Sequence, residues 1–449
     1  MRYALPLLFL ALLALRLCHS AIVWVEEAYP TAATIQLLAG KTLYRDIWFD
    51  KPPLSAFLYM LWGAHIGVPL RLAGAVFVFL CCWMIWRFAQ ELWGAREGIA
   101  AALLLGFFLT FGIPSAVMAL APDLLMVLPH IAAVYLAWRG RAFWSGIAGG
   151  MALLINPKGI FVLAACALWT GRAWPQLLGG FVIPNILALG WFGRPYINEV
   201  WCWGALYAGQ PFALVTAMTR TLNWAGFHCA LVAAAAVAFW KQKSWRMAGW
   251  LLLSLIAVAA GWRFFPRYYF QLLPVMTLLA ARGYVLLGRK RVIIWLLLLI
   301  PVVRFGPRYV MLANDLLHHR ETQWSDLALE QDSHAAADRI GHTGTILVWG
   351  YRPDIFAYTR LPAGTRFLDS QPLTGVLADR HLTSSEASAP EIAAENRREL
   401  IQTRPTWIVD GLGPLNPQLA ITNYPDLRDW LANYEPTART QFTVIYKLK

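Results

Sequence analysis

Acidic residues are scarce in the first two thirds of this chain. Of the 25 Asp and Glu in 449 residues, only eight lie between residues 1 and 303, against 23 Lys and Arg. Charged residues make up 14% of the whole chain and hydrophobic residues 59%, with a mean hydropathy of +0.50. So little charge excludes an ordinary soluble enzyme and predicts a polytopic membrane protein.

Cysteine is scarce too, and several common motifs are missing. The chain has six cysteines, none after residue 229 and none in a C-x-x-C pair, so neither a disulfide framework nor a zinc site is predicted. No His cluster has metal-ligand spacing, and there is no Gly-rich phosphate loop, internal repeat or low-complexity tract. We therefore predict no metal site from ligand spacing, and the need for a divalent cation is left open.

The charge divides the chain into two parts. Residues 1–303 carry a net charge of +15 and residues 304–449 a net charge of −2. A basic membrane part indicates positive cytoplasmic loops, so we do not predict nucleic-acid binding. We expect a transmembrane domain at residues 1–304 and a soluble domain at residues 305–449, which is long enough for its own core.

Apolar segments of near-spanning length recur along the first part. We predict eleven transmembrane helices, near residues 3–20, 70–90, 98–115, 119–138, 142–156, 159–171, 174–193, 224–240, 246–262, 268–287 and 291–304. The Lys and Arg clusters then fall on alternate connections, which places the N-terminus inside and the C-terminal domain outside. The first segment also resembles a secretory signal peptide, but Arg16 interrupts it and we expect an uncleaved span.

The remaining segments complete the predicted architecture. Residues 53–67 are apolar but too short to span, so we expect a helix lying in the membrane interface, anchored by Trp62. The C-terminal part predicts a small α/β domain. Its expected strands are residues 345–350, 406–410 and 440–448, and its expected helices are residues 389–403 and, more weakly, 424–434.

The first predicted outer loop, residues 21–69, holds half of the eight acids and is where we expect the chemistry. Glu26 and Glu27 point about 100° apart on a helix, so one can face a cleft while the other makes local bonds. A carboxylate facing a cleft can act as a general base. The alternative is a pair of helix N-terminal acids stabilised by the helix dipole.

Further groups are predicted on the same outer side. Asp123 lies in an apolar segment, where a carboxylate facing lipid is costly, so it either caps its helix or faces inward near the Glu pair. Lys51, Lys158 and Arg267 suit lipid phosphates, although each also fits a simpler role as an interfacial anchor or a helix end. Arg267 stands with Arg263 among aromatic residues, of which Tyr268 is the next in the chain.

Several of these motifs together resemble a known superfamily. The motifs are Glu26-Glu27-Ala28-Tyr29, Tyr44-Arg45-Asp46, Asp50-Lys51-Pro52-Pro53-Leu54, Arg71-Leu72, Pro122-Asp123, Asn156-Pro157-Lys158, Pro266-Arg267-Tyr268 with Leu273-Pro274, and the segment 346–351. This pattern is similar to that of the GT-C glycosyltransferases, in particular the bacterial protein-mannosyltransferase-like and aminoarabinose-transferase-like branches. The first position of the loop pair is Glu here, where that superfamily usually has Asp.

The resemblance implies a fold, a reaction and a site. A sugar would pass from a polyprenyl-phosphate donor to a hydroxyl of a lipid or glycan acceptor, at the outer face of a bacterial plasma (inner) membrane. The implied catalytic residues are Glu26, as general base, with Glu27 and Asp123. The implied donor-phosphate residues are Lys51, Lys158, Arg267 and Tyr268. A transporter or flippase of lipid-linked sugars is the alternative, and a non-catalytic binding subunit is a third hypothesis.

Overall fold

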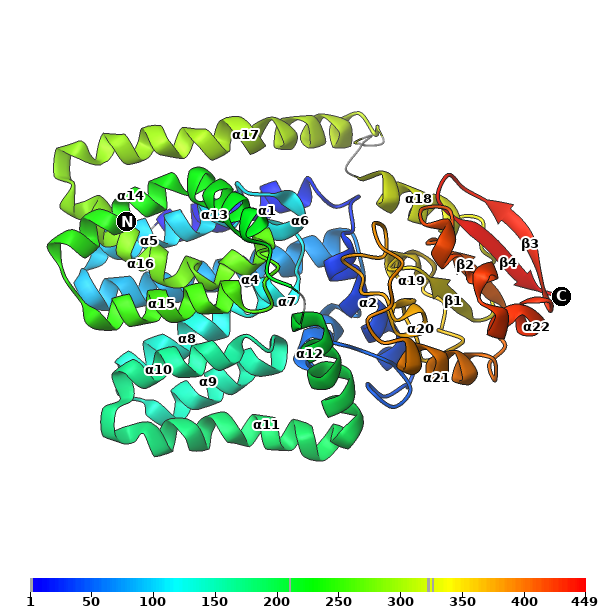
Figure 1. The fold of residues 1–449 in the computed structure, drawn as a ribbon. Coiled ribbons are helices and arrows are strands. Elements are labelled where there is room, and N and C mark those ends of the chain that lie inside the picture. Colours follow the sequence, from blue (N-terminus) through cyan, green and yellow to red (C-terminus); the bar gives the residue numbers. More distant parts are fainter. Residues whose placement is uncertain (1–2, 210, 321–323, 325–326) are drawn as a thin grey trace.

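A bundle of apolar helices and a small sheet domain lie end to end in the computed structural model (Figure 1). The structure describes residues 3–209, 211–320, 324 and 327–449. The bundle is formed by α1 (Ala4–Leu17), α4 (Val68–Trp93), α5 (Ala95–Phe108), α6 (Pro114–Val117), α7 (Pro122–Leu125), α8 (Val127–Trp138), α9 (Ala142–Ile155), α10 (Gly159–Thr170), α11 (Trp174–Tyr196), α12 (Trp203–Ala208), α13 (Leu214–Phe227), α14 (Cys229–Lys241), α15 (Trp245–Ala259), α16 (Leu273–Leu286) and α17 (Val292–Leu317).

Each of the eleven predicted spans coincides with a helix of this bundle. Three helical stretches, residues 68–93, 159–208 and 288–317, are long and apolar enough to cross a membrane by themselves. The pair α13 and α14 passes the same criterion together but is bent by 84°. Most of the others have 12–15 residues and are about 18–22 Å long, less than the roughly 30 Å of a bilayer core. The multi-pass helical membrane fold is confirmed, and the number eleven stays a prediction.

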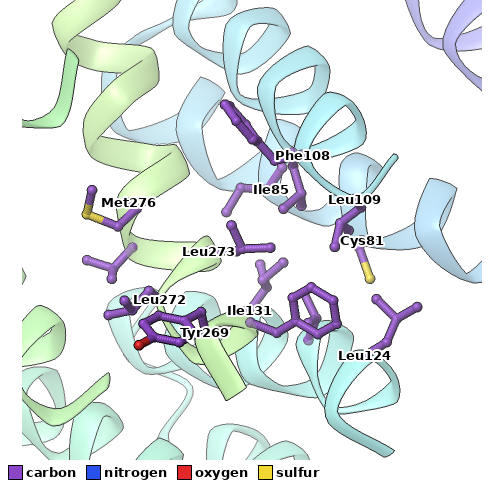
Figure 2. Packing of buried hydrophobic residues seen from close by; sticks show 14 of the residues in the cluster. Cys81, Ile85, Phe108, Leu109, Leu124, Ile131, Tyr269, Leu272, Leu273 and Met276 are labelled. Atoms are coloured by element: carbon purple, nitrogen blue, oxygen red, sulfur yellow. The ribbon is translucent and has the colours of Figure 1, made fainter. Parts of the chain in front are cut away.

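Apolar side chains from distant segments form the core of the bundle. Figure 2 shows Cys81 and Ile85 of α4 beside Phe108 of α5 and Leu273 of α16. Each of these four side chains is almost completely buried. The packing therefore fixes α4, α5 and α16 relative to one another.

Arg16 is buried at the end of α1, where the sequence suggested an interruption. Its guanidinium donates to the backbone oxygens of Val117 (2.6 Å) and Met118 (3.0 Å). A Cβ on Gly74 of α4 would lie 2.8 Å from Arg16 Nη1, so this glycine makes room for the arginine. Arg16 thus fixes the loop that leads into α7.

The first outer loop folds into short helices against the bundle. They are α2 (Val25–Leu38), α3 (Leu54–Phe57) and the 3₁₀ helix η1 (Leu58–Trp62). The predicted interfacial helix at 53–67 is therefore shorter than expected and ends at Gly63, whose φ of 63° suits glycine. Tyr59 of η1 is buried and donates to the backbone oxygen of Leu120 at 2.7 Å.

The C-terminal domain contains a four-stranded mixed sheet. The strands are β1 (Ile346–Trp349), β2 (Trp407–Asp410), β3 (Tyr434–Arg439) and β4 (Val444–Leu448), in the order β1-β2-β4-β3. Strands β1 and β2 are parallel, and β4 is antiparallel to both β2 and β3. The helices are α18 (Ala328–Ala337), α19 (Asp354–Thr359), α20 (Gln371–Thr374), α21 (Pro390–Leu400) and α22 (Arg428–Leu431).

Three predicted strands and one predicted helix of this domain are confirmed, and one element is corrected. The helix predicted at 424–434 is shorter, a 3₁₀ turn η9 (Pro425–Leu427) followed by the four residues of α22, and β3 begins at Tyr434. Strand β3 was not among the predicted elements. Pro436 lies inside it and is tolerated because β3 is an edge strand, which needs no hydrogen bond on its outer side. The predicted domain boundary at residue 304 lies inside α17, which continues to Leu317.

The C-terminal domain docks onto the first outer loop. Side chains of both parts, including Tyr44 and Phe49 of the loop and Val348 and Phe356 of the domain, form one buried apolar cluster. Arg366 reinforces the contact by pairing with Glu199 and donating to the backbone oxygen of Tyr44 at 2.9 Å. This docking brings residues separated by more than 300 positions to the same place.

Candidate active site

Glu26, Arg267 and Asp123 form the centre of the candidate site. Glu26 lies in the first turn of α2, and its carboxylate pairs with Arg267 Nη1. Arg267 belongs to the 3₁₀ helix η4 (Pro266–Gln271), and its Nε lies 3.5 Å from Asp123 Oδ2. The Glu26 and Arg267 side chains are 20% and 25% exposed, so the pair is open to a ligand. Two carboxylates thus share one guanidinium.

Asp123 is positioned by its own helix and by a neighbouring loop. Pro122 begins α7, which leaves Asp123 in the first turn, near free backbone N–H groups. Asn156 Nδ2, at the end of α9, donates to Asp123 Oδ1 at 3.1 Å. Asn156 Oδ1 in turn accepts from the backbone N–H of Lys158 at 3.0 Å. The Asn-Pro-Lys turn therefore orients the carboxylate and presents the lysine together.

Lys158 reaches the same place without a hydrogen-bond partner of its own. Its ammonium lies 3.0 Å from the centroid of the Tyr268 ring, in a cation–π contact. Among the residues that the structure describes, none hydrogen-bonds the buried Lys158 Nζ. The guanidinium of Arg267 lies 6.0 Å from the same ring. Two cations thus lie near the Tyr268 ring.

Glu27 points away from this centre. It is fully buried and accepts hydrogen bonds from Nη2 and Nη1 of Arg71, at 2.5 and 2.9 Å. The backbone N–H groups of Trp24 and Leu120 also donate to it, each at 3.1 Å. The Glu27 carboxylate thus accepts four hydrogen bonds. We expected one of the two glutamates to make local bonds of this kind, and in the structure it is Glu27.

Lys51 lies near Tyr29, a residue of α2. Tyr29 follows Glu26 by three residues and shares its face of α2. The Lys51 ammonium lies 6.0 Å from the centroid of the Tyr29 ring and bonds both oxygens of Asp50 at 2.9 Å. Lys51 thus lies near the Tyr29 face of α2, and among the described residues it makes no direct contact with Arg267.

Two residues of the C-terminal domain complete the site, and sequence reasoning did not single out either. The Tyr351 ring lies 5.8 Å from that of Tyr29. Burial raises the pKa of Tyr351, and the carboxylates of Asp50 and Glu26 raise it further. Asp369 is buried, and Asp50 adds to the effect of burial in raising its pKa to about 7.

One of these two residues has a partial signal in the sequence. Tyr351 ends the segment 346–351, which belongs to the motifs of the resemblance, whereas nothing in the sequence distinguished Asp369. Asp369 Oδ1 accepts from the backbone N–H of Gln371 at 2.7 Å, and its Oδ2 has no hydrogen-bond partner among the described residues. The C-terminal domain therefore contributes the Tyr351 phenol and the Asp369 carboxyl group, of which one oxygen has no hydrogen-bond partner among the described residues.

Arg263, which stands near Arg267 in the sequence, is directed elsewhere. It pairs with Asp379 of the C-terminal domain at 2.9 Å and lies over the Tyr207 ring at 4.7 Å. Its neighbours Trp262 and Phe264 both have positive φ, 57° and 49°, a conformation that costs non-glycine residues energy. The loop before η4 is therefore held by contacts with the C-terminal domain.

The arrangement suits transfer chemistry at a phosphate. Lys51, Lys158 and Arg267 offer positive charge to phosphate oxygens, and Glu26 offers a carboxylate within reach of the same space. Among the described residues there is no group of three or more His, Cys, Asp and Glu side chains that could hold a metal ion. The class of protein indicated by this fold and site is a membrane enzyme that acts on a lipid-linked phosphate.

Comparisons with known proteins agree with that class. The family model described as dolichyl-phosphate-mannose-protein mannosyltransferase matches residues 50–184. The crystal structure of ArnT from Cupriavidus metallidurans bound to undecaprenyl phosphate superposes with a TM-score of 0.61 at 16% identity, covering 99% of this chain and 98% of that one. The same ArnT in the apo state gives 0.57 at 15% identity, with 98% and 97% covered.

A second kind of structure shares the fold. The oligosaccharyltransferase AglB from Archaeoglobus fulgidus, in complex with an inhibitory peptide and a dolichol-phosphate, gives a TM-score of 0.51 at 12% identity. It is matched over 100% of this chain and 74% of its own length. No curated protein sequence matches the chain. The predicted resemblance to GT-C glycosyltransferases is confirmed by the family match and by the shared fold.

Proposed function

We infer that this protein is a membrane glycosyltransferase that moves a sugar from a polyprenyl-phosphate donor to an acceptor hydroxyl. The observation that carries this conclusion is the meeting of Glu26, Asp123 and Arg267 beside Lys158, in a fold shared with the undecaprenyl-phosphate-bound ArnT. The acceptor is a lipid or a glycan. We place the C-terminal domain on the extracytoplasmic side of a bacterial inner membrane, because the predicted cationic loops lie on the opposite side.

In this proposal the cations bind the donor phosphate. Lys158 has a buried ammonium without a hydrogen-bond partner among the described residues, which is costly until an anion arrives. Lys51 approaches from the first loop, where its bonds to Asp50 leave the side chain about one third exposed. Tyr268 keeps Lys158 and Arg267 on its two sides, so the phosphate is received by groups that are already in place.

Glu26 then acts as the general base. Before the donor binds, Arg267 pairs with Glu26. When the donor phosphate takes up the guanidinium, the Glu26 carboxylate becomes free to accept the proton of the acceptor hydroxyl. The hydroxyl oxygen attacks C1 of the sugar, the bond from C1 to the phosphate oxygen breaks, and polyprenyl phosphate leaves with the bonding electrons. Asp123, oriented by Asn156, positions the acceptor.

Purified protein tests this reaction directly. In detergent, with polyprenyl-phosphate-linked sugars and an envelope extract as acceptor, we expect free polyprenyl phosphate and a glycosylated product, both detected by mass spectrometry. Glu26→Gln and Lys51→Ala should abolish both products while the protein remains monodisperse. A transporter would give no turnover, because detergent leaves no bilayer to cross. Such a result, or wild-type rates in both variants, would overturn the proposal.

A further inference from the structure

A large apolar groove runs along α5, from Arg96 at the end of the bundle far from the C-terminal domain to Phe111, just beyond the other end of the helix. Its volume is about 820 Å³, within the range of about 300–1,000 Å³ typical of ligand pockets. It is lined by residues of α1, α5, α16 and α17 and of the turn before α17. In Figure 1, the beginning of α17 is at the end of the bundle opposite the sheet domain.

The groove has two arginines at one end and apolar walls elsewhere. Arg96 in the first turn of α5 and Arg291 just before α17 are its only charged lining residues. Both are exposed, and neither forms an ion pair within the described part of the chain. Leu103 and Trp295, both largely exposed, line the groove further along. A positive mouth thus opens onto an apolar channel.

A second cavity beside the first carries more positive charge. It has a volume of about 690 Å³ and lies between the ends of α14 and α16. Lys241, Arg289 and Lys290 line it together with Trp240, which is 84% exposed, and its lining contains no acid. The two cavities lie on either side of the turn Gly288–Arg291. An exposed tryptophan and a cluster of cations are typical of the level of lipid headgroups.

We propose that the groove binds an anionic glycerophospholipid of the leaflet opposite the C-terminal domain. Its phosphate pairs with Arg96 and Arg291, and its acyl chains lie along the apolar walls, between α17 and the helices α1 and α5. Guanidinium groups suit phosphate oxygens, and the absence of acids from the lining disfavours the ammonium of a zwitterionic headgroup. The lipid fills a space that would otherwise separate α17 from the rest of the bundle.

The position of the groove separates this lipid from the sugar donor. The donor phosphate belongs at Lys51, Lys158 and Arg267, near the C-terminal domain, whereas Arg96 and Arg291 lie at the other end of the helices. A donor whose phosphate lay on those two arginines would hold its sugar far from Glu26. The proposed lipid is therefore a structural ligand, and its binding does not depend on the proposed reaction.

Native mass spectrometry of the full chain in mild detergent tests the proposal. We expect wild-type protein to retain added phosphatidylglycerol in clear preference to phosphatidylcholine. The double variant R96A/R291A should retain at least 10-fold less phosphatidylglycerol than wild type. The matched control R141A/R172A removes two exposed arginines of other connections and should retain the lipid as wild type does. The variant L103W keeps both arginines but fills the groove, and it should also lose retention.

Several outcomes would overturn the proposal. Equal retention of both lipids, or equal loss in R96A/R291A and R141A/R172A, would show that the cations bind lipid without a specific site. Retention of polyprenyl phosphate in place of phosphatidylglycerol would assign the groove to the donor. If R96A/R291A is not monodisperse, L103W decides, and its wild-type retention would rule out lipid in the groove.

Discussion

Glu26 and Glu27 are consecutive residues of α2, yet their carboxylates bind arginines from opposite parts of the bundle. Glu26 pairs with Arg267 in a partly open position, and Glu27 pairs with Arg71 of α4 in a fully buried one. The helical rotation of about 100° between neighbours separates the two directions. One carboxylate is thereby available to a ligand, while the other holds α2 to α4 and to the loop before α7.

We predict that Glu26→Gln removes activity and leaves the fold intact. The amide keeps the size of the side chain but cannot accept the acceptor proton, so the transfer rate should fall about 10²–10⁴-fold. The measurement is the initial rate of polyprenyl phosphate release. Glu91→Gln is the matched control, because Glu91 is an ion-paired glutamate at the far end of α4. A loss of rate in the control as large as that in Glu26→Gln would contradict the assigned role.

Glu27→Gln should instead destabilise the protein. The substitution leaves the Arg71 guanidinium buried without its counter-charge, and breaking such a pair costs about 3–5 kcal/mol. Thermal unfolding in detergent should show a clear fall in Tm for Glu27→Gln or Arg71→Met. The double variant Glu27→Met with Arg71→Met should recover part of it, because no unpaired charge remains. Equal Tm values for Glu26→Gln and Glu27→Gln would contradict the structural role assigned to Glu27.

Lys158→Met and Lys51→Met should weaken donor binding. Each removes one positive charge from the proposed phosphate site, and each well-placed donor of this kind is worth about 2.7–4 kcal/mol in the transition state. We therefore expect a fall of roughly 10²–10³-fold in kcat/KM for the donor. Lys51→Arg and Lys158→Arg keep the charge and should recover part of the rate. Unchanged KM and kcat in both methionine variants would place the phosphate elsewhere.

Asp369 should make stability depend on pH. Its pKa in the folded protein is raised to about 7, by burial and then by Asp50, so the folded state holds this proton more tightly than the unfolded chain. The resulting stabilisation is fully present below about pH 4 and is lost as the pH rises through 7. Tm should therefore fall between pH 5 and 8 more steeply in wild type than in Asp369→Asn. Parallel curves for the two proteins would contradict the prediction, and Glu391→Gln, an exposed change on α21, should leave the wild-type slope unchanged.

Arg366→Ala should loosen the C-terminal domain from the first outer loop. The variant loses the pair with Glu199 and the hydrogen bond to Tyr44, leaving a buried glutamate without its partner. Hydrogen exchange of residues 42–50 should rise markedly, and turnover should fall because Lys51 directly follows this segment. Arg398→Ala, an exposed arginine of α21, is the matched control. If exchange in this segment is equal in the two variants, Arg366 is not what holds the domain.

The sequence by itself determined the membrane-embedded helices, the two-part organisation and most of the candidate residues. Hydrophobic runs and alternating basic clusters are local properties, and each predicted span overlaps a helix because the bilayer selects for them. Spacing also showed that Glu26 and Glu27 diverge. Strand β3 at residues 434–439 was not predicted, and it forms the edge of the sheet through its pairing with β4.

Only the tertiary structure decided which glutamate is partly exposed and which residues surround it. The choice depends on Arg71 and Arg267, which approach α2 from helices far away in the sequence. The rings of Tyr29 and Tyr351 lie 5.8 Å apart although more than 300 residues separate them, and the docking of the C-terminal domain alone creates that contact. Local patterns fix the direction of a side chain relative to its own helix, whereas its partners are fixed by packing between segments that no local pattern relates.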